Sequence, residues 1–226
     1  MINIGALIFF ILFVIVSLIE LILAFNEVEK WRKIVKPFSL LLLAISALIA
    51  LPSHPLIYIG ALLGMIGDIF LIFVHKRKLF ILGTISFLLG HFAYISEILF
   101  IMLTNNPVPW WFYVVAIFLM LVVVLAFYPF SKKITGNRYL SLLGNLYLSV
   151  LVLVTVTSVI ASAKGFTNFM VLGIVGGLSF LASDLILIQA TFVKDFKRRD
   201  YYIMLFYLLG QALIVSGLSL TYLYMV

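Results

Sequence analysis

The sequence contains no cysteine and very little charge. Only 10% of its 226 residues are charged, while 65% are hydrophobic. A soluble domain normally carries about 25% charged residues, so this chain could not cover a water-facing surface. The absence of cysteine excludes disulfide bonds, thiol nucleophiles and thiolate metal ligands. The composition therefore predicts an all-α, polytopic membrane protein that forms a single helical domain over residues 1–226.

Acidic residues are also scarce, which gives the chain a formal net charge of +7 at pH 7. A strongly basic balance can indicate nucleic-acid binding. In this chain the basic residues lie in short segments between apolar runs, where Lys and Arg act as topology signals. Nucleic acid is therefore not an expected partner.

The apolar runs predict eight transmembrane helices. Crossing about 30 Å of hydrocarbon takes roughly 20 helical residues. Runs suited to this lie near residues 2–25, 37–51, 56–74, 80–103, 110–129, 139–162, 169–193 and 201–225. Pro52 and Pro55 are expected to separate the second run from the third, because proline lacks a backbone donor and disfavours helix before it. The second span is then the short one.

The basic residues predict the orientation of these spans. All of the 15 Lys and Arg residues except Lys164 follow the first, third, fifth or seventh span. The positive-inside rule then places both termini on the non-cytoplasmic side. We expect a multi-pass protein of a bacterial plasma membrane, with the endoplasmic reticulum as the alternative.

Two segments of the chain resemble each other. One begins with GDIFLIF at Gly67 and the other with SDLILIQ at Ser183, so that Asp68 corresponds to Asp184. Each continues through a basic segment to LLG and a polar residue, which is His91 in the first and Gln211 in the second. This predicts two parallel four-helix halves, residues 1–105 and 106–226, related by an axis along the membrane normal. The alternative is chance similarity between apolar segments.

Polar side chains inside the predicted spans fall at similar depths. At about 1.5 Å per helical residue, Asp68, Asp184 and His91 lie roughly 9 to 17 Å from the inner ends of their spans. Ionisable residues at membrane depth usually face the bundle interior and mark function. We therefore predict that these three are catalytic and border a shared polar cavity. The candidate substrate-binding residues at similar depth are Tyr94, Tyr147, Tyr207, Gln211 and Asn145. For each residue the alternative is a structural hydrogen bond between helices.

Two glutamates also lie inside predicted spans. Glu20 falls near the depth of the aspartates, and it either belongs to the site or reaches the membrane surface with its flexible side chain. Glu97 lies nearer the outer side, and we expect it to have a structural role.

Paired carboxylates in a low-dielectric cavity suit acid-catalysed hydrolysis. One can donate a proton while the other remains charged and activates water. An acetal-like or enol-ether bond is a suitable substrate, because the second carboxylate stabilises the oxocarbenium-like charge. A zinc hydrolase is the alternative, but it would need three protein ligands. His54 is predicted in an outer loop and His75 at the inner edge, which leaves His91 alone in the polar layer, so no metal or other cofactor is expected.

Several motifs in order along the chain resemble the YhhN-like family of lysoplasmalogenases. They are GDIFLIF, GHFAY, SDLIL and YLLGQALIVSG, together with Tyr147 and the Lys36–Pro37 pair that opens the second span. The resemblance implies an eight-span hydrolase that cleaves the vinyl-ether bond of lysoplasmalogens to a fatty aldehyde and glycerophosphoethanolamine or glycerophosphocholine. The implied partners are water and a lysophospholipid from the cytoplasmic leaflet. The family's polar positions fall on Asp68, His91, Tyr94, Tyr147, Asp184, Tyr207 and Gln211.

Two other classes of function remain open at this point. Repeated halves with intramembrane acids also describe proton-coupled transporters of a small solute or lipid. The spans lack the paired Gly/Pro breaks expected of such carriers at the polar layer. A non-catalytic lipid-binding or scaffold protein is the third class, and lipid turnover would distinguish a hydrolase from both.

Overall fold

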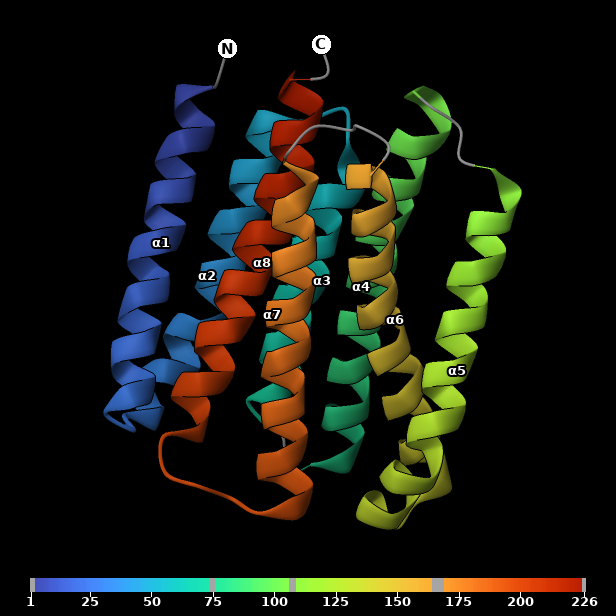
Figure 1. Ribbon diagram of the computed structural model, residues 1–226. Coiled ribbons are helices and arrows are strands. Elements are labelled where there is room, and N and C mark those ends of the chain that lie inside the picture. The colour runs from blue at the N-terminus through green and yellow to red at the C-terminus, as the bar shows by residue number, and fades with distance from the viewer. Residues whose placement is uncertain (1–2, 74–75, 106–108, 164–168, 225–226) are drawn as a thin grey trace.

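The computed structural model describes residues 3–73, 76–105, 109–163 and 169–224, and these residues are almost entirely helical (Figure 1). The helices in chain order are α1 (Ile4–Phe25), α2 (Glu29–Ala50), α3 (Pro55–Leu71), α4 (Arg77–Asn105), α5 (Trp110–Thr135), α6 (Arg138–Ala163), α7 (Met170–Ile188), the π-helical turn η1 (Gln189–Val193) and α8 (Arg199–Tyr224). The prediction of an all-α protein is confirmed.

Seven of the helices are long and apolar enough to cross a membrane, and α3 is a shorter apolar helix of 17 residues. The chain is therefore a multi-pass membrane protein. Successive helices alternate in direction, so that the described ends of α1 and α8 lie at the same end of the bundle (Figure 1). The connections α1–α2, α5–α6 and α7–α8 lie at the opposite end, together with the end of α3 and the start of α4.

The predicted start of the second helix was wrong. Helix α2 begins at Glu29 rather than at residue 37, and Pro37 lies inside it. The basic residues expected in a connection therefore lie on the first two turns of α2; they are Lys30, Arg32, Lys33 and Lys36. The predicted span was limited to an apolar run, so it left out these charged turns. The short helix is consequently α3 and not α2.

The remaining described basic residues lie at this same end of the bundle, which we call the basic end. Lys132 and Lys133 are on the last turn of α5, and Arg138 begins α6. Lys164, expected on the other side, and His75, expected at the inner edge, lie outside the described residues.

Close helix crossings recur in the two halves of the chain. A Cβ atom added to Gly90 of α4 would lie 2.9 Å from the carbonyl oxygen of Gly60 in α3. One added to Gly210 of α8 would lie 3.0 Å from the carbonyl oxygen of Gly176 in α7. Gly60 and Gly176 each precede the aspartate of their own helix by 8 residues (68 − 60 and 184 − 176). This match is what the predicted duplication requires, and the duplication itself stays a prediction.

The first helix of each half packs differently. Helix α1 packs on α2 and also on α8, whereas α5 packs on α6 and η1. These two helices occupy opposite edges of the bundle in Figure 1. A cavity lies between α4, α5, α6 and α7, and the end of α3 and η1 also line it.

We expect Gly210→Ala to destabilise the protein by about 1–3 kcal/mol, because its new methyl group would meet backbone atoms that no side-chain rotation can move. The measurement is the thermal unfolding midpoint of the detergent-solubilised protein. Gly144→Ala is the matched control, since a Cβ there meets nothing within 4 Å and alanine favours helix over glycine. Equal midpoints in the two variants would contradict the close crossing of α7 and α8.

Candidate active site

Asp68 of α3 is buried, with 1% of its surface exposed, and it is held by side chains from two other helices. Tyr207 of α8 donates its hydroxyl hydrogen bond to Oδ2 of Asp68 at 2.7 Å. Lys36 of α2 places Nζ 3.2 Å from Oδ1. No cation lies near Asp68 in the sequence, so the tertiary structure supplies the cation. Removing one partner of such a buried pair leaves an uncompensated charge, which makes the pair a constraint on how α2, α3 and α8 assemble.

A second hydrogen bond lies next to this ion pair. Tyr94 of α4 donates its hydroxyl hydrogen bond to Oε1 of Gln211 in α8, at 2.8 Å. Gly64 of α3 leaves room for both polar groups of α8, since a Cβ there would lie 3.3 Å from Nε2 of Gln211 and 3.5 Å from the hydroxyl of Tyr207. Four of the predicted site residues, Asp68, Tyr94, Tyr207 and Gln211, therefore form two adjacent hydrogen-bonded pairs between α3, α4 and α8.

His91 of α4 is buried in the core and has an unused nitrogen. Its Nδ1 donates a hydrogen bond to the carbonyl oxygen of Phe87 at 2.7 Å, since a carbonyl oxygen can only accept. With Nδ1 protonated, a neutral ring presents Nε2 as an acceptor, and Nε2 has no partner among the described residues. The ring packs edge-on against Phe180, and its centroid lies 6.0 Å from the Tyr94 ring and 6.2 Å from the Tyr147 ring.

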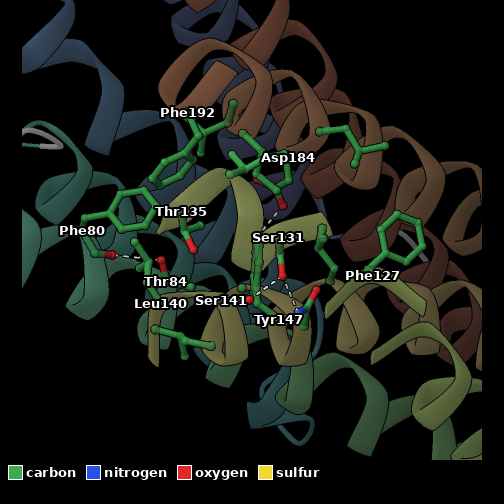
Figure 2. Close-up of a pocket in the computed structure, with 18 of the residues that line it drawn as sticks. Phe80, Thr84, Phe127, Ser131, Thr135, Leu140, Ser141, Tyr147, Asp184 and Phe192 are labelled. Carbon is green, nitrogen blue, oxygen red and sulfur yellow. Dashed lines mark hydrogen bonds between the residues drawn. The ribbon is translucent and has the colours of Figure 1, made fainter. Parts of the chain in front are cut away.

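Asp184 of α7 borders a cavity of about 120 Å³, which we call the apolar cavity (Figure 2). Tyr147 of α6 also lines it and donates its hydroxyl hydrogen bond to Oδ2 of Asp184 at 2.6 Å. Among the residues that the structure describes, Asp184 has no cation within ion-pair distance. Most of the wall is apolar, and its five phenylalanines are Phe80, Phe87, Phe127, Phe130 and Phe192. A carboxyl group thus faces a space shaped for hydrocarbon.

A small polar cluster interrupts the same wall (Figure 2). Asn145 donates from Nδ2 to Oγ of Ser131 at 2.7 Å, and the hydroxyls of Ser131 and Ser141 share a hydrogen bond. All three residues line the apolar cavity. Oδ1 of Asn145 is buried and has no partner within the described part of the chain. An unpaired buried acceptor costs free energy, so this oxygen favours a ligand or water that can donate to it.

A second cavity of about 460 Å³, which we call the charged cavity, lies at the basic end between α2, η1 and α8. Its charged lining residues are Glu29, Arg32, Lys33, Lys36, Asp195, Arg199 and Asp200. Arg32 places Nε 3.1 Å from Oε1 of Glu20 and also pairs with Asp200. Glu20 has 0% of its surface exposed, so it belongs to this network and does not reach the membrane surface.

Glu97 lies away from these groups, toward the opposite end of the bundle. Its Oε1 accepts a hydrogen bond from Tyr222 at 2.6 Å and lies 2.8 Å from Nδ1 of His54. The ring of His54 stacks on Tyr222. Among the described residues, no group of three or more His, Asp or Glu side chains could hold a metal ion.

The structure therefore separates the predicted site residues into two neighbouring groups. Asp184, Tyr147 and Asn145 line the apolar cavity, whereas Asp68 and its hydrogen-bonded neighbours do not. The two groups meet through aromatic rings, because Phe87 lines the cavity and packs edge-on against Tyr207.

Sequence patterns identified Tyr207 and Tyr147 as site residues but missed the cations that pair with Asp68 and Glu20. Lys36 was noticed only as part of a motif, and neither Arg32 nor Asp200 was a candidate. Arg32 and Asp200 lie 168 residues apart, so no local pattern could have joined them.

The model of the YhhN family matches residues 31–218 of the chain. The matched range includes every predicted site residue and Lys36. No curated protein and no solved structure matches the chain significantly.

The Lys36–Asp68 ion pair can be tested by a double-mutant cycle. We expect Lys36→Met to lower the free energy of unfolding by about 3–5 kcal/mol, because it leaves Asp68 buried without its cation. Adding Asp68→Asn to that variant should recover part of the loss, since the unpaired charge is then removed. Thermal unfolding midpoints of all four proteins in one detergent provide the measurement. A double variant that is less stable than Lys36→Met by the full effect of Asp68→Asn would contradict the coupling.

Proposed function

This chain belongs to the YhhN family, and from that premise we propose that it is a membrane-embedded hydrolase of the vinyl-ether bond of lysoplasmalogens. The products are a fatty aldehyde and glycerophosphoethanolamine or glycerophosphocholine. The observation that carries the proposal is Asp184, a buried carboxyl group that Tyr147 holds at the wall of a mostly apolar cavity. Vinyl-ether hydrolysis requires a proton donor beside a hydrocarbon chain, and this arrangement supports that role for Asp184. We further propose that all eight helices span the membrane, with the basic end in the cytoplasm.

The reaction consumes one water and involves no net oxidation or reduction. A proton adds to the alkenyl carbon that does not bear oxygen, which produces an oxocarbenium ion at the carbon that does. Water adds to that carbon and releases a proton, giving a hemiacetal. The hemiacetal then breaks its bond to the glycerol oxygen, which takes up a proton, and the chain leaves as an aldehyde. The protein must therefore supply an acid, stabilise the cation and hold the water.

Asp184 is the proposed acid. An isolated charge in a low-dielectric wall is costly, so a carboxyl group without a cation beside it is suited to carry a proton. Tyr147 donates to Oδ2, so Oδ1 is the oxygen proposed to bear that proton. His91 is proposed to hold the attacking water, because its Nε2 is a buried acceptor and its ring contacts the ring of Tyr147.

Asp68 is the proposed source of negative charge for the oxocarbenium ion. Its ion pair with Lys36 and its hydrogen bond from Tyr207 fix the position of its carboxylate. It lies one helical turn before Leu71, which lines the apolar cavity beside Asp184. In a low-dielectric interior, the Asp68 carboxylate can attract an oxocarbenium ion in the apolar cavity without direct contact.

The first experiment is aldehyde release from a lysoplasmalogen by the detergent-purified protein. We expect Asp184→Asn to lower kcat by about 100-fold or more, which is the usual contribution of a general acid. Glu27→Gln is a matched carboxylate-to-amide control on an exposed residue at the basic end, and it should keep the wild-type rate.

A full rate in correctly folded Asp184→Asn would overturn the assignment of the acid. Absence of aldehyde with the wild-type protein would overturn the hydrolase. Movement of protons or solute across proteoliposomes, without any change in the lipid, would then favour the transporter.

Gly144 is a position from which a larger side chain can be directed at the apolar cavity. Gly144 lines it, and a Cβ there meets nothing within 4 Å. We expect Gly144→Phe to lower kcat/KM for long-chain lysoplasmalogens by roughly tenfold or more, as the ring takes the space of several methylene groups at about 0.8 kcal/mol each. Gly144→Ala should stay near wild type, and a short-chain substrate should be less affected. Equal kcat/KM in both variants would show that the chain binds elsewhere.

A further inference from the structure

We propose that the charged cavity is the head-group half of one continuous substrate site, and that it binds the zwitterionic phosphodiester head group of a lysophospholipid. The apolar cavity beside Asp184 is the chain half of the same site. This inference rests on the proposed function and extends it to the residues that select the head group. Its contacts come from α2 and α8, which carry none of the proposed catalytic groups.

The two cavities share part of their walls. Leu71 at the end of α3 and Leu187 near the end of α7 line both of them. Each leucine follows its helix's aspartate by three residues (71 − 68 and 187 − 184), which is about one helical turn. The boundary between hydrocarbon and charge therefore lies one turn from Asp68 on one side and one turn from Asp184 on the other. A molecule with an apolar chain and a charged head would place the bond between them at this boundary.

The bond that the proposed reaction cleaves has this position in a lysoplasmalogen. The vinyl ether joins the hydrocarbon chain to glycerol, and the phosphodiester follows at the other end of the glycerol. When the hydrocarbon chain occupies the apolar cavity beside Asp184, the phosphate lies in the charged cavity, on the other side of Leu71 and Leu187.

The cations of the charged cavity differ in how firmly they are held. Lys36 and Arg32 are paired with the buried carboxylates of Asp68 and Glu20. Breaking either pair would leave a buried charge uncompensated. These two cations therefore remain with their present partners when a ligand enters.

Lys33 and Arg199 are held far more weakly. Lys33 pairs with Glu29 on α2, and Arg199 at the start of α8 pairs with Asp195 in the connection before it; the two carboxylates are 69% and 63% exposed. Arg199 also places Nε 3.5 Å from Oδ1 of Asp200, a longer contact that a ligand at the other guanidinium nitrogens would leave in place. Exposed ion pairs of this kind contribute about 0.2–1 kcal/mol. A phosphodiester can replace either carboxylate, and the Arg199 guanidinium can hold two of its oxygens at once. The carboxylates released from these pairs would face the ammonium group of the same head group.

Binding and catalysis can be tested separately with ligands that the enzyme cannot cleave. The probes are 1-O-alkyl-lysophosphatidylethanolamine, whose saturated ether resists acid, and 1-O-alkylglycerol of the same chain length. Affinities are measured for the full-length protein in nanodiscs. We expect the wild type to bind the phospholipid roughly tenfold more tightly, as charged hydrogen bonds contribute about 1.5–3 kcal/mol each. Lys33→Gln/Arg199→Gln should remove this preference and leave the affinity for alkylglycerol unchanged.

Lys30→Gln/Lys197→Gln is the matched control. It removes the same charge from the same end of the bundle, at exposed residues that do not line the charged cavity. We expect it to keep the preference, which separates a cavity contact from general attraction to the basic end. Free glycerophosphoethanolamine is the third probe, and weak competition by it would show that the chain and the head group must be joined.

The outcomes distinguish failure of the head-group site from failure of the proposed hydrolase. Equal affinity of the wild type for the two lipids, or equal loss in the two double variants, would overturn the head-group site even if aldehyde is released. Head-group-dependent binding lost only in Lys33→Gln/Arg199→Gln, without aldehyde from a lysoplasmalogen, would support this site and overturn the hydrolase. In an active enzyme, the same double variant should raise KM for lysoplasmalogen by roughly tenfold and leave kcat nearly unchanged.

Discussion

The ion pair between Lys36 and Asp68 is the interaction on which the rest of the site depends. A lone carboxylate inside a membrane bundle is costly, and Asp68 is almost completely buried. The cation that compensates it is Lys36 of α2. The charged first two turns of α2 must therefore be helical at the basic end, so that Lys36 reaches Asp68. Tyr207 connects the same carboxylate to α8. One acidic residue in α3 thereby fixes three helices around a charged cavity that a purely apolar bundle would not contain.

Similar crossings surround the two aspartates, but their environments differ. Gly90 approaches Gly60 as Gly210 approaches Gly176, and the aspartates lie eight residues beyond Gly60 and Gly176. The difference comes from the neighbouring helices, because α2 brings Lys36 to Asp68 whereas α5 and α6 leave the apolar cavity beside Asp184. Asp68 is consequently enclosed with a cation, and Asp184 borders a mostly apolar space. Under the proposed mechanism, these two environments would suit Asp68 to the role of fixed anion and Asp184 to that of proton donor.

Local sequence signals predicted the helices and the acidic residues well, but not how the polar groups associate. The apolar runs identified every helix, and Asp68 and Asp184 were conspicuous because charge is rare inside such runs. The start of α2 was missed because its first turns are stabilised by ion pairs with α1, α3 and α8, which no apolarity criterion detects. The cluster of Asn145 with Ser131 was invisible for a related reason, since serine is common in membrane helices and carries no signal of its own. Similar depth in the membrane predicted one shared cavity, whereas helix rotation decided which side chains face it.

Cleavage of a lipid between its chain and its head group requires both environments within one molecule's length. A wholly apolar site would exclude the water that the reaction consumes, and a wholly polar one would not hold the chain. The shared walls at Leu71 and Leu187 bring the two environments together, with a carboxyl group one helical turn behind each leucine. If the proposed reaction takes place here, water and the soluble phosphodiester product would use the charged cavity, while the aldehyde would stay in the apolar cavity. The charged product would then leave without crossing the apolar wall, and the boundary proposed to position the bond would also separate its products.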